Sequence, residues 1–198
     1  NNKANPFPGK VFNNPKHQDV YHDVPKDYVG AEVTPETFVK VLLGDAELEN
    51  AGKKVLKSGP NDNVFIFFDD HGAPDLVAFP KTYLYGEKLA ETLKKMHADN
   101  KYSKLVFYIE ACEAGSMFDK LLPTDINIYA TTASNPKESS YAYYSDTEVK
   151  TSLGDEYSIH WMENAETASD TTTLQEQYEY TKAQTKMSHV MQYGDLSI

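Results

Sequence analysis

The sequence predicts an α/β protein with a mostly parallel sheet between two layers of helices. Three short runs rich in aromatic and β-branched residues, 64–68, 104–109 and 126–132, are typical of strands. Segments with helical periodicity alternate with them, and such alternation implies right-handed crossovers between parallel strands, with helices on both faces. The 198 residues, 40% of them hydrophobic, are enough for a single domain over 1–198 with a continuous core.

The amino-terminal segment, residues 1–33, is predicted to be a surface arm or loop. It is rich in Asn, Pro, Lys and His and has little hydrophobic periodicity. Four prolines interrupt any long element in it: Pro6, Pro8, Pro15 and Pro25.

Three helices follow from capping and periodicity. Thr34 can cap a helix whose first residues are Pro and Glu, and this helix should end near Leu43, before Gly44. Apolar residues with charges between them follow the helical period over about 85–97. The polar segment 174–190 predicts a long helix near the end of the chain.

Two predicted strands end in residues that can carry chemistry. The run 64–68 follows the turn cluster at 57–63, is predicted to be fully buried, and stops at the sequence DDHG, which contains His71. The run 104–109 stops at EAC, which contains Cys112. Because parallel neighbours place their carboxyl ends at one edge of the sheet, the two side chains are expected close together.

A cysteine beside a histidine suggests acyl transfer through a thioester. The thiol of Cys112, the only cysteine, needs a base to lower its pKa from about 8.5, and His71 could supply one. The backbone N–H groups of Gly72 and Cys112 could stabilise a developing oxyanion. Taken singly, a lone cysteine is more often structural and a histidine beside glycine is more often an ordinary loop residue. Glu110 is either solvated charge or the acidic wall of a pocket, and the second reading is favoured because it ends a buried run.

Composition argues against several other classes. A net charge of −11 and a pI of about 4.9 give no indication of a positively charged surface that would bind nucleic acid or an anionic membrane. No stretch approaches the about 18 apolar residues that a membrane span needs. Two groups of residues contain side chains that can bind metals: 69–71, and His17 with His22 and Asp23. Successive residues on a strand face opposite sides, however, and no His or Cys spacing matches a zinc site. No metal or other cofactor is predicted.

Three segments, in this order and spacing, resemble the legumain family, also called asparaginyl endopeptidases. They are FIFFDDHGAP, VFYIEACEAGSMF and YATTASNPKESSYAYY. The likeness extends to DVPKDYVG and VTPETF upstream and to LGDEYSIHWME and SHVMQYGD downstream, so it covers almost the whole chain. The resemblance implies a caspase-like three-layer αβα sandwich and a cysteine endopeptidase.

The resemblance also implies a reaction and site residues. The family cuts after asparagine and, at acidic pH, after aspartate, and some members reseal peptide bonds. By motif, His71 corresponds to the catalytic histidine and Cys112 to the nucleophile, with Gly72 contributing to the oxyanion hole. Asp70 matches an aspartate that some members convert to a succinimide. The pocket for the asparagine side chain is implied at Glu110, Ser139, Ser140 and Asp155.

The family further implies a lysosomal, endosomal or secreted enzyme that acts on proteins and peptides and is inhibited by cystatin-type proteins. No Asn-X-Ser/Thr sequon is present, so this location rests on the resemblance. A protonated substrate aspartate resembles asparagine in shape, so one acid-lined pocket could accept both at low pH.

Some features depart from the family pattern. Its first strand and helix, which carry an asparagine near the catalytic histidine and an Arg-His pair, have no match in 1–33, so the chain is expected to begin after them and to stop before the inhibitory prodomain. Two alternatives follow: a related peptidase of basic specificity, or a non-catalytic fragment. Asp75 stands where relatives often have glycine, and Asp tolerates the positive φ that this loop could need.

Overall fold

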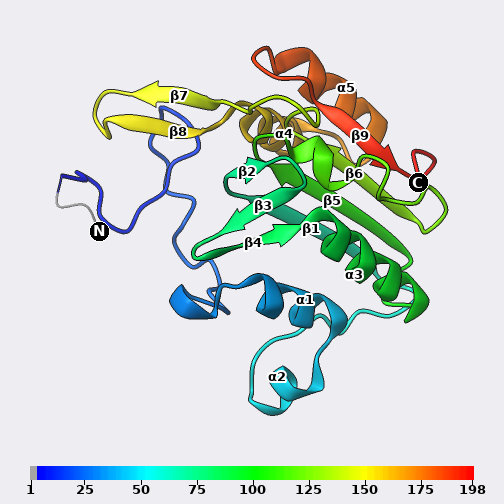
Figure 1. Ribbon diagram of the computed structural model, residues 1–198. Helices are drawn as coiled ribbons and strands as arrows, with labels where there is room; N and C mark the ends of the chain where they lie inside the picture. The colour runs from blue at the N-terminus through cyan, green and yellow to red at the C-terminus, as the bar shows by residue number, and fades with distance from the viewer. Residues whose placement is uncertain (1–3) are drawn as a thin grey trace.

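The fold is built on a four-stranded sheet in a computed structural model that describes residues 4–198 (Figure 1). The strand order is β1-β5-β6-β9. The first three strands are parallel and β9 is antiparallel to β6, which confirms the predicted mostly parallel sheet. The bounds are Asn63–Asp69 for β1, Lys104–Glu110 for β5, Ile128–Thr132 for β6 and Met191–Gly194 for β9.

Helices cover both faces of this sheet, as predicted. Along β5, Leu105, Phe107 and Ile109 pack into one core, while Val106 and Tyr108 pack into a second core on the opposite face. The first core receives side chains from α1 and α3, and the second from α4 and α5. The helices are α1 Pro35–Leu43, α2 Ala46–Asn50, α3 Gly86–Ala98, α4 Glu156–Thr167 and α5 Leu174–Gln184, with short 3-10 turns η1 Gly30–Glu32 and η2 Ala114–Met117.

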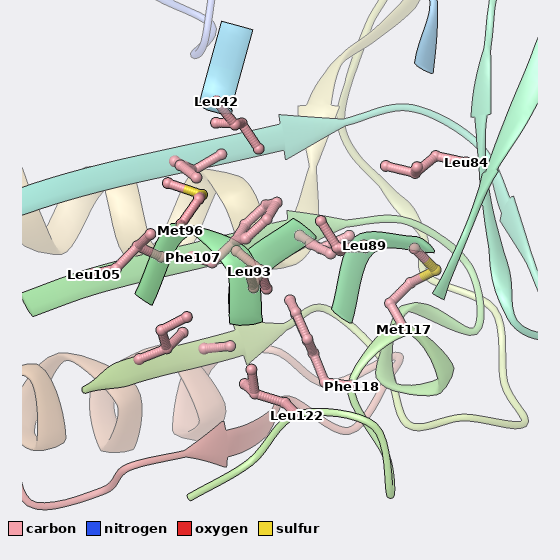
Figure 2. Close-up of a cluster of buried hydrophobic side chains, with 14 of the residues drawn as sticks. Leu42, Leu84, Leu89, Leu93, Met96, Leu105, Phe107, Met117, Phe118 and Leu122 are labelled. Atoms are coloured by element: carbon pink, nitrogen blue, oxygen red, sulfur yellow. The ribbon is translucent and has the colours of Figure 1, made fainter. Parts of the chain in front are cut away.

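The first core joins the sheet to the segment that follows the predicted nucleophile. Figure 2 shows Leu93 of α3 beside Phe107 of β5, with Met117 and Phe118 closing the same cluster. All four side chains are buried. The segment from Cys112 to Phe118 is therefore anchored by apolar packing.

Two small antiparallel sheets flank the carboxyl end of the main sheet. A three-stranded meander is formed by β2 Gly72–Ala73, β3 Leu76–Phe79 and β4 Thr82–Tyr85. A hairpin is formed by β7 Ala142–Asp146 and β8 Thr151–Asp155 and projects from the body of the domain (Figure 1). The sequence patterns predicted neither sheet, nor α2 and α4.

The predicted start and end of α1 are confirmed. The Thr34 hydroxyl accepts a hydrogen bond from the Thr37 N–H at 3.0 Å, and Pro35 is the first helical residue. Gly44 ends the helix in the left-handed region, with φ of 69°. The predicted helix over 85–97 is confirmed as α3, displaced by one residue.

The prediction that 64–68 is fully buried is wrong. Strand β1 lies at the edge of the sheet, and its side chains alternate between buried and exposed. Phe65 is 54% exposed and Phe67 is 37% exposed, and both make edge-on ring contacts with Trp161 of α4. The sequence could not reveal this, because a run of aromatic residues does not say whether a strand has neighbours on both sides.

The predicted helix over 174–190 is too long. It ends at Gln184, where Thr185 adopts extended backbone and its hydroxyl donates to the Thr181 carbonyl at 2.8 Å. The chain then turns back so that β9 can pair with β6. The non-local ladder outweighs the weak helical preference of this polar segment.

The amino-terminal arm has no long element between residues 4 and 33, as predicted, while residues 1–3 lie outside the described part. It runs beside the β7–β8 hairpin (Figure 1). His17 Nε2 lies 2.7 Å from Asp146 Oδ2, and His17 Nδ1 lies 3.5 Å from Glu148 Oε2. Within residues 4–198, no helix is both long enough and apolar enough to span a bilayer.

Candidate active site

The carboxyl ends of β1 and β5 meet as the sequence predicts. Asp69 and Glu110 are register partners in the parallel ladder, and the Asp70 N–H donates to the Glu110 carbonyl at 3.2 Å. The chain then passes through His71, whose carbonyl accepts from the Ala78 N–H at 2.8 Å. These backbone bonds bring the histidine and cysteine segments to one edge of the sheet.

A cleft of about 370 Å³ opens at this edge. Most of the predicted site residues line it, whereas Gly72 and Ser139, both half-buried, are not among its lining residues. Two lining residues, Asp69 and Ala142, were not predicted as site residues. The sequence signal that could have identified Asp69 is its position directly after the predicted strand 64–68. The cleft is lined by Asp69, Asp70, His71, Glu110, Cys112, Ser140, Ala142 and Asp155.

Gly72 makes the closest approach between the two segments. A Cβ atom on this residue would lie 2.2 Å from the Cys112 carbonyl oxygen and 2.9 Å from the Ala111 Cβ. Real contacts are never so short, so only glycine fits here without displacement of one segment. This contact sets the spacing between His71 and Cys112.

The turn around Cys112 is held by several hydrogen bonds. The Ser134 hydroxyl donates to the Ala111 carbonyl and accepts from the Ala114 N–H, both at 3.0 Å. Glu113 has a φ of 49°, and its N–H donates to the Glu138 carbonyl at 2.7 Å. The free thiol of Cys112 is partly exposed, with Sγ 3.8 Å from the Ser140 carbonyl oxygen.

The loop after His71 is held by a hydrogen bond to the segment that follows Cys112. Asp75 adopts a φ of 64°, which confirms that this position needs a left-handed conformation. Its N–H donates to the buried Ser116 hydroxyl at 2.7 Å, and that hydroxyl donates to the Glu113 carbonyl at 2.7 Å. Ser116 therefore ties the histidine loop to the cysteine turn.

Glu110 forms the deep wall of the cleft and is only 1% exposed. Its Oε2 accepts from the Ser158 N–H at 3.0 Å and from the Ser158 hydroxyl at 2.8 Å, in the first turn of α4. Its Oε1 is buried and has no hydrogen-bond partner among the described residues. Burial raises the pKa of Glu110 to about 8, although the bonds from Ser158 and the nearby Ser140 side chain oppose this change.

Two further carboxyl groups share the cleft with Glu110. Burial raises the pKa of Asp155, the residue that precedes α4, and the nearby His71 opposes the increase. Desolvation within the cleft, followed by the charges of Asp155 and Asp70, raises the pKa of Asp69 to about 6. Among the described residues that line the cleft, His71 alone can carry a positive charge.

The acidic and histidine residues do not gather into a metal centre within residues 4–198. No group of three or more His, Cys, Asp or Glu side chains is arranged there to hold an ion. The groups of the cleft that can take part in chemistry are a thiol, an imidazole and carboxyl groups.

The fold resembles that of a solved caspase structure. Caspase-1 from Spodoptera frugiperda superimposes with a TM-score of 0.57 over 82% of this chain and 68% of that one, at 12% identity. This similarity establishes the caspase-like fold that the sequence resemblance implied. In this chain, a cysteine and a histidine lie at neighbouring strand ends of that fold.

The chain belongs to the peptidase C13 family, whose model matches residues 1–198. It is 53% identical over its whole length to legumain from Rattus norvegicus, covering 46% of that protein. It is 53% identical to hemoglobinase from Schistosoma japonicum, over 98% of this chain and 46% of that one. It is 49% identical over its whole length to vacuolar-processing enzyme from Vicia sativa, covering 43% of it. The chain thus spans slightly less than half the length of these relatives, and the resemblance to the legumain family is confirmed.

Proposed function

We propose that this domain is a cysteine endopeptidase that hydrolyses peptide bonds after asparagine, and after aspartate at acidic pH. The observation that carries the proposal is the buried, unpartnered Oε1 of Glu110 in the same cleft as Cys112 and His71. A polar atom left unsatisfied at that depth costs stability unless a ligand satisfies it.

The reaction would proceed through a thioester. His71 takes the proton from Cys112, and the thiolate attacks the carbonyl carbon of the scissile bond. The negative charge on the substrate oxygen is stabilised by the backbone N–H groups of Gly72 and Cys112, and the imidazolium then protonates the departing amine. Water hydrolyses the thioester, or an incoming amine attacks it instead and reseals a peptide bond.

The pocket chemistry suits an asparagine side chain. Because Oε2 of Glu110 accepts two hydrogen bonds, the proton of the neutral carboxyl resides on Oε1 and can be donated to the amide oxygen. The carboxyl of Asp155 and the hydroxyl of Ser140 can accept from the amide NH2. Ser139, adjacent to Ser140, would position this wall. A protonated aspartate has the same shape and no charge, so it would bind only at low pH.

Asp70 is proposed to have a modifiable carboxyl. Its Oδ1 accepts a hydrogen bond from the N–H of His71 at 2.6 Å, which holds this nitrogen close to the Asp70 carboxyl. Attack of that nitrogen on the protonated carboxyl carbon, with loss of water, would close a succinimide.

A second candidate function is cleavage after a basic residue. The cleft carries four carboxyl groups, and His71 is the one described lining residue that can offset them. An arginine or lysine side chain would find ionised partners there at neutral pH.

The setting of the enzyme is proposed from the relatives and the charge. Members of the family with names such as legumain and vacuolar-processing enzyme suggest an acidic compartment, lysosomal or endosomal, or secretion. A net charge of −11 at neutral pH is partly relieved at acidic pH, which fits such a setting. Proteins and peptides with asparagine or aspartate before the scissile bond would be substrates, and cystatin-type proteins would be inhibitors.

The test is the intact mass of the 198-residue chain after exposure, near pH 5, to a peptide that carries asparagine beside a thiol-reactive group. A single adduct at Cys112, absent in Cys112→Ser and strongly slowed in His71→Ala, is expected. A matched arginine peptide distinguishes the two candidates, because faster labelling by it would favour basic specificity. A folded chain that reacts equally with asparagine, arginine and glycine peptides would contradict both.

A further inference from the structure

We propose that Asp69 is a specificity-determining residue of the cleft, whose carboxylate excludes a charged aspartate side chain and so sets the pH below which aspartate is accepted. The inference rests on the proposed function and assigns a role to a residue that no motif identified.

The geometry of β1 directs Asp69 into the cleft. Phe65, Phe67 and Asp69 lie on one face of the strand, and the two rings contact Trp161 of α4. Asp69 is also the register partner of Glu110, and such partners on parallel strands point to the same face. The Glu110 carboxyl points to the first turn of α4, so Asp69 leaves the sheet on that side as well.

A second observation marks this cleft as a binding site. The Glu110 side chain is almost fully buried, yet its Oε1 has no partner among the described residues. Without that unpartnered atom, the four carboxyl groups that line the cleft would be no more than a cluster of acidic residues. The unsatisfied atom marks a place for a polar group of a ligand, and Asp69 lines the same cleft.

The charge of Asp69 affects which side chains the cleft accepts, because other titratable groups lie around it. Three carboxyl groups share the cleft with Asp69: Asp155 just before α4, Asp70 next in sequence, and Glu110, the partner of Asp69 on strand β5. Within residues 4–198, His71 is the one lining side chain that can form a cation. No described side chain forms a hydrogen bond or ion pair with the Asp69 carboxyl. Desolvation and the charges of Asp155 and Asp70 raise its pKa to about 6, so it ionises between lysosomal and neutral pH.

These features predict how the pocket distinguishes two similar side chains. Near neutral pH, Asp69 is ionised and repels an aspartate carboxylate, whereas a neutral asparagine amide can donate to it. As the pH falls, Asp69 becomes protonated together with the substrate carboxyl, and the repulsion disappears. Selectivity for asparagine is therefore expected to be high at neutral pH and to weaken at acidic pH.

The experiment compares kcat/KM for two peptides that differ only in asparagine or aspartate before the scissile bond, between pH 4.5 and 7.5. In Asp69→Asn, the aspartate-to-asparagine ratio at pH 7 should rise about tenfold, as expected for removal of one nearby charge. The asparagine rate of each variant is measured in parallel as the reference for its ratio. Asp69→Glu keeps the charge and should keep the wild-type ratio, while Asp170→Asn removes an exposed charge elsewhere and is the matched control.

The outcomes separate this inference from the proposed function. Cleavage after asparagine by the wild-type domain tests the function, and the ratio in Asp69→Asn tests the role of Asp69. An unchanged ratio in Asp69→Asn with normal asparagine cleavage would overturn the inference alone. A ratio that rises equally in Asp69→Glu would also overturn it, because charge would then not be the cause. Absence of asparagine cleavage in a folded wild-type domain would overturn both.

Discussion

The close approach of Gly72 to the cysteine segment makes a quantitative prediction for Gly72→Ala. The added Cβ would lie 2.2 Å from the Cys112 carbonyl oxygen, whereas an ordinary carbon–oxygen contact is about 3.3 Å or more. The two segments must therefore separate by about 1 Å, and neither gives way easily. The cysteine turn is held by Ser134, and the histidine loop is held by the bond from Ala78.

A displacement of about 1 Å between a nucleophile and its base can cost about a hundredfold in rate. Gly72→Ala is thus expected to lower kcat/KM on an asparaginyl peptide by about two orders of magnitude. Labelling of Cys112 by an asparaginyl thiol-reactive peptide should slow to a similar degree. The fold should persist, because the clash lies at the edge of the sheet and reaches a single member of the first core, Ala111.

The assay measures both rates near pH 5, together with circular dichroism and thermal unfolding to show that the variant is folded. Gly59→Ala is the matched control, because a Cβ there would meet only the Asp62 carboxylate, at 3.9 Å. This control should keep wild-type rates. A folded Gly72→Ala with kcat/KM within threefold of the wild type would refute the claim that this contact sets the spacing of His71 and Cys112.

Three further predictions concern stability. Leu93→Ala removes a fully buried side chain and should cost about 2–5 kcal/mol of unfolding free energy in urea, so a loss below about 1 kcal/mol would contradict its place in the core. Glu110 has a pKa raised to about 8 in the folded state from an ordinary 4.5, so its contribution to stability is present below about pH 4.5 and is lost as the pH rises through about 8. The urea midpoint of the wild type should therefore fall from pH 5 to pH 8, and Glu110→Gln should reduce that fall; an equal fall in both proteins would argue against a buried neutral carboxyl. His17→Ala removes the link between the arm and the β7–β8 hairpin, and amide hydrogen exchange over 142–155 should quicken, whereas unchanged exchange would show that the hairpin is held by other contacts.

Several elements were predictable because their signals are local. The cap at Thr34, the proline after it and the left-handed Gly44 lie within one helix, so the limits of α1 follow from residues near them. The amphipathic period likewise identified α3. Elements whose stability comes from distant partners were missed or misjudged, such as β9, which exists through its ladder with β6.

The candidate site shows the same division. The sequence by itself determined the chemistry available, because His71 and Cys112 follow two apolar runs typical of strands, and the order of motifs identified the family. Only the tertiary structure decided that β1 is an edge strand, that Asp69 shares the cleft, and that Oε1 of Glu110 has no partner among the described residues. The physical reason is that burial, register and the pKa of a carboxyl depend on groups far apart in the chain, which become neighbours only when the sheet and α4 assemble.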